Sequence, residues 1–177
     1  MKRALIIAAD RFEDLELIYP LYRLEEAGWK VDIASHSKKT ITGQRGYECK
    51  AGHAFKDVAA DQYALLVIPG GKAPESVRLD KDAIKITKYF FKKNLPVAAI
   101  CHGAQVLISA GVVKGRKLTC WKGIRDDVTA AGGDYRDCRV AEDQNLITSR
   151  FPDDLPYFMG DIFRMFETPR LKKVVGG

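Results

Sequence analysis

Three short apolar runs constrain the fold of this chain more than any other feature. They occupy residues 4–9, 64–68 and 96–100 and contain only Ala, Val, Leu, Ile and one Pro. A strand without polar positions is buried on both faces, as in a parallel sheet covered by helices on each side. Helical patterns separate the runs, and right-handed crossovers between such strands produce a doubly wound sandwich. The sequence therefore predicts an α/β fold with a mostly parallel sheet and helices on both faces.

The first helical pattern covers residues 13–28, with leucines along one stripe and acidic residues in its first turn. Gly28 stands where a glycine commonly ends a helix, and Pro20 is expected to kink this helix or to end its first part. Residues 36–55 are polar and rich in turn residues, which suggests a small hairpin. Further helices are expected over residues 81–93, 104–110, 123–131 and 153–167, and further strands over 29–35 and near 117–120, 138–141 and 146–149.

The length of 177 residues fits one domain, which we assign to residues 1–167, followed by a basic tail at 168–177. The formal net charge is +6, but the lysines cluster only in pairs. Such dispersed charge is typical of a solvated surface and argues against a nucleic-acid partner. The apolar run near the N-terminus is too short for a signal peptide or a membrane span, so we expect a cytoplasmic protein without a membrane partner.

The cysteines and histidines are widely spaced and form no Cys-x-x-Cys pair or metal-ligand cluster. We therefore expect free thiols in a reducing compartment, and neither a metal nor another cofactor. The residues concerned are Cys49, Cys101, Cys120, Cys138, His36, His53 and His102.

Ligands of open α/β sheets bind at the carboxyl ends of the strands. Each buried run is followed there by a segment that carries reactive or turn-forming residues, namely residues 10–14, 69–75 and 101–103. We therefore expect these segments to meet in one site.

Cys101 is the sharpest feature of this group, because it stands between a buried strand and the start of a helix. Such a strand-to-helix turn exposes one side chain, and Gly103 provides the small neighbour that it requires, although Ala99 replaces the first glycine of the usual pattern. The helix start is expected to lower the pKa of the thiol, and its amide groups can hold an oxyanion. The alternative is an inert cysteine of the core.

His102 is the natural base or ion-pair partner for this thiol, although direct contact between adjacent residues requires the irregular turn. The alternative is a histidine that only packs. A third group should orient the imidazole, and the candidates are Glu13, Asp14, Glu16 and Glu75. A protonated Glu13 in a dry pocket could instead donate a hydrogen bond to the thiolate.

The Pro-Gly-Gly turn at residues 69–71 is the second informative loop. Two glycines allow a close approach of the backbone and expose amide donors. We assign the N–H of Gly71 to one half of an oxyanion hole and an N–H of the elbow, that of His102, to the other half. A simple tight turn is the alternative, and the sequence contains no phosphate-binding loop pattern.

Residues 10–16, 69–75 and 99–103 resemble, in order and spacing, the three hallmark segments of the ThiJ/PfpI superfamily. The resemblance covers residues 2–167 and is closest to the branch of PfpI intracellular proteases and deglycases. Further matching segments are residues 40–46, 107–111, 115–119 and 148–155.

This resemblance implies a flavodoxin-like sandwich in which Cys101 is the nucleophile and His102 its partner. It implies that Glu75 completes the triad by reaching across to a neighbouring subunit of a homo-oligomer, a dimer or a hexamer. It also implies that Glu13 is the acid beside the cysteine. Trp121 is expected to form a wall of the pocket, and Gly70 to contact the substrate.

The resemblance implies a cysteine hydrolase of the peptidase or deglycase type, in which a thiolate attacks a carbonyl carbon without a cofactor. Its substrate would be a peptide, a small carbonyl compound or a glycated adduct. Two alternatives remain: a cofactor-free glyoxalase that converts methylglyoxal to lactate, and a non-catalytic sensor or chaperone of oxidative stress.

Overall fold

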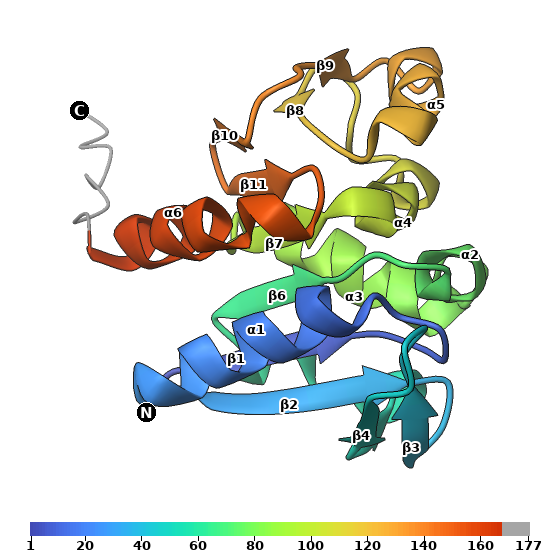
Figure 1. Ribbon diagram of the computed structural model, residues 1–177, viewed down its shortest axis with the longest axis vertical. Coiled ribbons are helices and arrows are strands. Elements are labelled where there is room, and N and C mark those ends of the chain that lie inside the picture. Colours follow the sequence, from blue (N-terminus) through green and yellow to red (C-terminus); the bar gives the residue numbers. More distant parts are fainter. Residues whose placement is uncertain (168–177) are drawn as a thin grey trace, which may run out of the picture.

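The computed structural model describes residues 1–167, so the predicted tail at 168–177 lies outside the described residues. Within residues 1–167, seven strands form one sheet in the order β10-β11-β7-β6-β1-β2-β5 (Figure 1). Neighbouring strands run parallel, except that β10 and β11 are antiparallel. This confirms the predicted α/β fold with a mostly parallel sheet. The strands are β1 (Arg3–Ile7), β2 (Lys30–Ser35), β5 (His53–Ala54), β6 (Leu65–Ile68), β7 (Val97–Ile100), β10 (Val140–Asp143) and β11 (Leu146–Ser149).

Helices cover both faces of the sheet, which explains why β6 and β7 contain only apolar residues and why β1 does so after Arg3. On one face α1 (Asp14–Glu26) packs against α6 (Leu155–Glu167), and on the other α3 (Lys81–Lys92) packs against α4 (Ala104–Ala110) (Figure 1). The sheet is thus the middle layer of a sandwich with a continuous apolar core.

Helix α1 begins and ends close to the predicted bounds. Glu13 is its N-cap, and Gly28 follows its end with a φ of 78°. The helix continues through Pro20, so the proline does not end its first part. A proline ring has a φ close to that of a helix, and its missing N–H removes only one of the hydrogen bonds of the helix.

Most of the remaining elements follow the expected pattern with shifted ends, but the two-residue strand β9 was not expected. The predicted hairpin is present as β3 and β4, and the short strands β8 and β9 form a separate pair. The five-residue helix α2 was not expected, because so short a helix after two glycines has no recognisable period. The bounds are β3 (Lys39–Thr42), β4 (Glu48–Ala51), α2 (Ala73–Val77), β8 (Lys117–Leu118), α5 (Arg125–Ala130) and β9 (Asp134–Tyr135).

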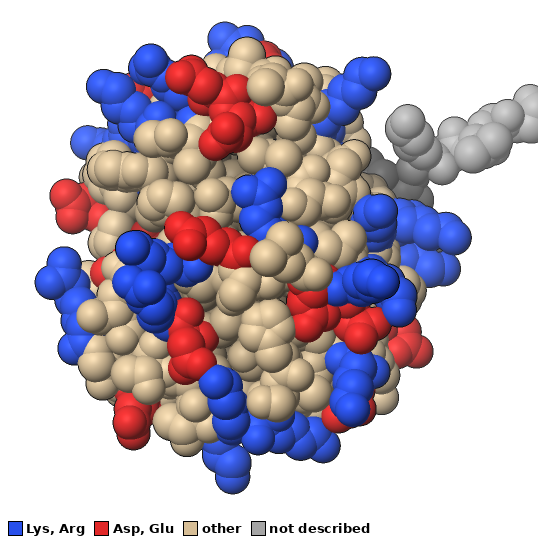
Figure 2. Space-filling model, turned by 90° about the vertical axis from the view of Figure 1, so that its right-hand side faces the viewer, with Lys and Arg blue, Asp and Glu red and all other residues tan. Residues whose placement is uncertain are grey.

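Figure 2 shows the face toward which the parallel strands point, with basic and acidic side chains interspersed over it. Among residues 1–167, no helix is both long enough and apolar enough to cross a membrane.

The sheet order brings the three marked segments together, because β7, β6 and β1 are neighbours and end at the same edge. The loops after β1 and β6 are joined by backbone hydrogen bonds. The N–H of Glu13 donates to the carbonyl of Gly70 at 3.2 Å, and the N–H of Lys72 donates to that of Arg11 at 2.8 Å. These hydrogen bonds therefore hold the loops after β1 and β6 against each other at this edge of the sheet.

Candidate active site

The chain turns sharply at Cys101, directly after β7. Cys101 has a φ of 59°, in the left-handed region that side chains other than glycine rarely adopt. It opens a 3₁₀ turn, Cys101–Gly103, which leads into α4. A Cβ atom on Gly103 would lie 2.4 Å from the carbonyl oxygen of Ile68, so the turn tolerates only glycine there. Backbone strain of this kind is typical of functional turns.

The turn brings the thiol of Cys101 to the imidazole of the next residue. The Cys101 Sγ lies 3.3 Å from the His102 Nδ1, a contact that a regular helix would not permit. Cys101 as a whole is only 7% exposed, so in the single chain the turn does not expose this residue as the sequence led us to expect. The imidazole stacks beside the Trp121 ring at a centroid distance of 6.3 Å. The thiol and the imidazole are therefore in direct contact in the structure.

The acid beside the sulfur is Glu16, and the expectation that Glu13 takes this place was wrong. Glu16 is fully buried, and its Oε2 accepts a hydrogen bond from the N–H of Gly70 at 2.7 Å. Its carboxylate also interacts with the Cys101 thiol.

Glu13 caps α1 instead, because it precedes the helix whereas Glu16 lies on the side of the first turn that faces the sheet. The Glu13 Oε2 accepts from the N–H of Glu16 at 3.0 Å, and its Oε1 lies 4.0 Å from the Arg45 Nε. Asp14, another candidate, accepts hydrogen bonds from the amides of Arg45 and Tyr47 and holds the β3–β4 turn.

Burial raises the pKa of Glu16 to about 8, and the nearby Glu13 carboxylate adds to this effect, while the Gly70 amide opposes it. Burial and the Glu16 carboxylate also raise the pKa of the Cys101 thiol. The expected lowering by the helix start was therefore outweighed by desolvation. Because the two groups repel each other as anions, the pair holds a proton at neutral pH. When Glu16 carries that proton, its charge no longer opposes a thiolate.

Two backbone amides act on the sulfur, those of Gly71 and His102, and both favour its anionic form. Gly71 has a φ of 76°, and a Cβ atom there would lie 2.3 Å from the backbone nitrogen of Glu13. A Cβ atom on Gly70 would lie 2.7 Å from that of Cys101. The two glycines are thus required for the backbone to come this close to Cys101 and to the loop after β1.

Glu75 is exposed on α2 and raises the pKa of His102, although burial has the larger, lowering effect and the net shift is downward. Within residues 1–167 of a single chain, no hydrogen bond joins Glu75 to the imidazole. In the single chain Glu75 therefore acts on His102 through its charge and not through a hydrogen bond.

Trp121 lies beside the imidazole and is 42% exposed. The backbone N–H of Trp121 donates to the backbone carbonyl of Cys101 at 3.3 Å. Its ring meets that of Phe151 edge to face at a centroid distance of 6.4 Å. Sequence reasoning missed Phe151, because only the path of the chain after β11 brings it here. In the described part of the chain, no group of three His, Cys, Asp or Glu side chains could hold a metal ion.

A model of the DJ-1/PfpI family matches residues 2–165. The chain is 47% identical over 165 residues to "Deglycase PfpI" of Pyrococcus furiosus, covering 93% of this chain and 99% of that protein. It is 40% identical over 158 residues to "Putative cysteine protease YraA" of Bacillus subtilis, covering 89% and 94%. The crystal structure of Drosophila melanogaster DJ-1beta superposes with a TM-score of 0.87 at 28% identity, covering 93% of this chain and 89% of that chain.

Proposed function

The chain belongs to the DJ-1/PfpI family, and from this premise we propose that it is a cysteine hydrolase of the peptidase or deglycase type. One observation carries the proposal. The Cys101 Sγ lies 3.3 Å from the His102 Nδ1, at a strained turn where two backbone amides also act on the sulfur. A nucleophile, a base and oxyanion donors are the parts that acyl transfer requires.

Burial lowers the pKa of His102, so its imidazole is neutral at neutral pH and can accept the thiol proton. The sulfur then forms a bond to the carbonyl carbon of the substrate, and the carbonyl oxygen takes up the electron pair. The amides of Gly71 and His102 would hold this oxygen. The protonated His102 gives its proton to the leaving amine, and water releases the acyl group from the sulfur.

In this mechanism Glu16 would remain protonated beside the sulfur. With a pKa near 8 it stays protonated at neutral pH, which removes a negative charge from the neighbourhood of the developing thiolate. The proposed catalytic set is therefore Cys101, His102 and Glu75, with Glu16 in place of Glu13 beside the sulfur.

We assign Glu75 to the orientation of an imidazole in a neighbouring copy of the chain. Its exposure on α2, together with the missing contact to His102 in its own described chain, supports a site shared within a homo-oligomer. Dimers and hexamers both satisfy this arrangement.

The substrate would be a peptide end, a small carbonyl compound or a glycated adduct. Trp121 would form a wall for its side chain, and Gly70 would line the backbone of the site. The names of the relatives, a deglycase and a cysteine protease, support this range of carbonyl substrates.

A substrate panel with wild type, Cys101→Ala, His102→Ala and Glu75→Ala tests the proposal. We expect wild type to cleave a fluorogenic peptide or to release the sugar from a glycated amine, and Cys101→Ala to lose at least about 1000-fold in kcat/KM. Conversion of methylglyoxal to lactate, without hydrolysis of either substrate, would replace the hydrolase by a glyoxalase. Equal behaviour of wild type and Cys101→Ala in all assays would leave only a non-catalytic role.

A further inference from the structure

A second cluster of reactive side chains lies outside the cysteine site. The His36 Nδ1 lies 2.8 Å from the Asp80 Oδ2, and the His36 Nε2 lies 3.3 Å from the Ser76 Oγ. The three residues come from the loop after β2, from α2 and from the start of α3. Hydroxyl, imidazole and carboxylate thus follow one another as in a Ser-His-Asp triad, which is recognised by geometry and not by sequence order.

Asp80 is held in place, because it is also the N-cap of α3. Its Oδ1 accepts hydrogen bonds from the amides of Asp82 at 2.9 Å and Ala83 at 3.3 Å, which leaves Oδ2 for the imidazole. A carboxylate oxygen can only accept, so the His36 Nδ1 carries the proton of that hydrogen bond. In the neutral ring the lone pair is then on Nε2, which faces the serine.

The His36 ring is also restrained from its side. It meets the Phe55 ring edge to face at a centroid distance of 5.2 Å. A ring held by Asp80 and Phe55 needs little reorganisation before it accepts a proton. His36 and Ser76 are both exposed in the single chain.

From this arrangement we propose that Ser76 is a second nucleophile, which accepts acyl groups from activated esters independently of Cys101. The Ser76 Oγ would attack the ester carbonyl while His36 removes the hydroxyl proton through Nε2. The new bond joins Oγ to the acyl carbon, and the bond from that carbon to the leaving oxygen breaks. His36 then returns the proton to the leaving alcohol, so that no other reactant is required.

The backbone around Ser76 predicts slow release of the acyl group. Two nearby backbone amides already have partners. The N–H of Arg78 donates to the backbone carbonyl of Pro74 at 3.0 Å, and the N–H of Leu79 donates to the backbone carbonyl of Ser76 at 3.1 Å. The Ser76 hydroxyl also lies 3.1 Å from the carbonyl of Ala73, which competes for its proton. Since these two amides are engaged, neither is free to hold the oxyanion that hydrolysis of the ester on Ser76 would form. The site should therefore be acylated once and remain acylated.

The test uses p-nitrophenyl acetate and the Cys101→Ala chain, which removes the catalytic thiol. We expect one acetyl group per chain on the peptide that contains Ser76, detected by mass spectrometry and formed with a burst of p-nitrophenol. Ser76→Ala in the same background should abolish the burst. His36→Gln, whose amide cannot take up the proton, should slow the acetylation of Ser76 by about 100-fold.

Asp80→Asn is the sharpest variant, because asparagine still caps α3 but no longer carries the charge that favours the reactive tautomer. We expect slower acetylation of Ser76 with unchanged thermal unfolding. Ser109→Ala is the matched control, since Ser109 accepts from the Arg78 Nε at 2.8 Å and should not influence the burst. Two results together would overturn the proposal: acetyl groups spread over the lysines, and acetylation of Ser76 that is no faster in Cys101→Ala than in the same chain with His36→Gln.

Discussion

The carboxylate of Glu16 interacts with the thiol of Cys101 in a fully buried corner below the turn that carries the thiol. The Glu16 carboxylate raises the pKa of the thiol, whereas a hydrogen bond with the thiol lowers the pKa of Glu16 against the larger, raising effect of burial. The protonation of this pair therefore links the stability of the fold to the reactivity of the thiol.

Glu16→Gln should change how stability depends on pH. The pKa of Glu16 is about 8 in the folded chain and near 4.5 in the unfolded chain, so the folded state binds the extra proton between these values. Wild-type stability attributable to this group is complete below pH 4.5 and falls by about 1.4 kcal/mol per pH unit as the pH rises toward 8. Urea unfolding between pH 5 and 8 should show a flatter profile for Glu16→Gln. Parallel profiles would contradict the raised pKa, and Glu25→Gln, at an exposed position of the same helix, serves as the control.

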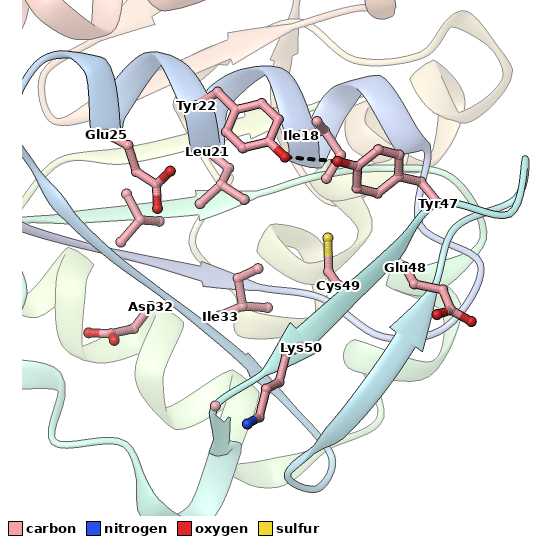
Figure 3. A pocket seen from close by; sticks show the side chains of 12 residues that line it. Ile18, Leu21, Tyr22, Glu25, Asp32, Ile33, Tyr47, Glu48, Cys49 and Lys50 are labelled. Atoms are coloured by element: carbon pink, nitrogen blue, oxygen red, sulfur yellow. Dashed lines mark hydrogen bonds between the residues drawn. The ribbon is translucent and has the colours of Figure 1, made fainter.

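Cys101→Gly should be more stable than Cys101→Ala by about 1 kcal/mol, because Ala retains the Cβ atom that a positive φ disfavours. The comparison is made by urea unfolding, with both variants lacking the thiol. At Cys49, in the extended strand β4 (Figure 3), the order should be reversed, since glycine there only adds entropy to the unfolded chain. A more stable Ala variant at position 101 would argue against strain in the turn.

Gly70→Ala should lower kcat/KM by at least about 100-fold, as expected for a displacement of reactive groups by an ångström. The new Cβ atom would lie 2.5 Å from the Glu16 Oε2 and 2.7 Å from the Cys101 Cβ. Gly52→Ala is the matched control, because a Cβ atom there would meet nothing within 4 Å. Its kcat/KM should equal that of wild type. Similar losses in the two variants would show that crowding at the site is not the cause.

Glu75→Gln should lower the pKa of His102 further, because the Glu75 charge is the factor that raises it. An NMR titration of the imidazole protons measures this shift, with the His36 and His53 signals as internal references. The acid limb of the kcat/KM profile should move to lower pH in parallel. Glu142→Gln on β10 should leave the His102 titration unchanged. A titration of His102 that is identical in wild type and Glu75→Gln would remove Glu75 from the proposed site.

Trp121→Ala should raise KM by about fivefold for substrates with an aromatic side chain, since the lost ring contact is worth about 1 kcal/mol. Trp121→Phe should retain most of the affinity. Tyr157→Ala, which removes another exposed ring, should have no effect on KM. Equal KM values for Trp121→Ala and wild type would place the substrate elsewhere.

The sequence by itself determined the parallel sheet, because strands buried on both faces leave an unbroken apolar pattern in residues 64–68 and 96–100. It also determined the turn at Cys101, since a cysteine between such a strand and a glycine at position 103 has few other local structures. These features depend on neighbours along the chain, which a single sequence displays.

Only the tertiary structure decided which acid meets the sulfur. Glu13 and Glu16 lie one helical turn apart, and the packing of α1 on the sheet buries the second while the first caps the helix. The same packing raises the pKa of the thiol that the helix start alone was expected to lower. The contacts of His36 with Ser76 and Asp80 span 40 and 44 positions of the sequence. Burial and long-range contact depend on how distant segments pack, and no local pattern of residues records this.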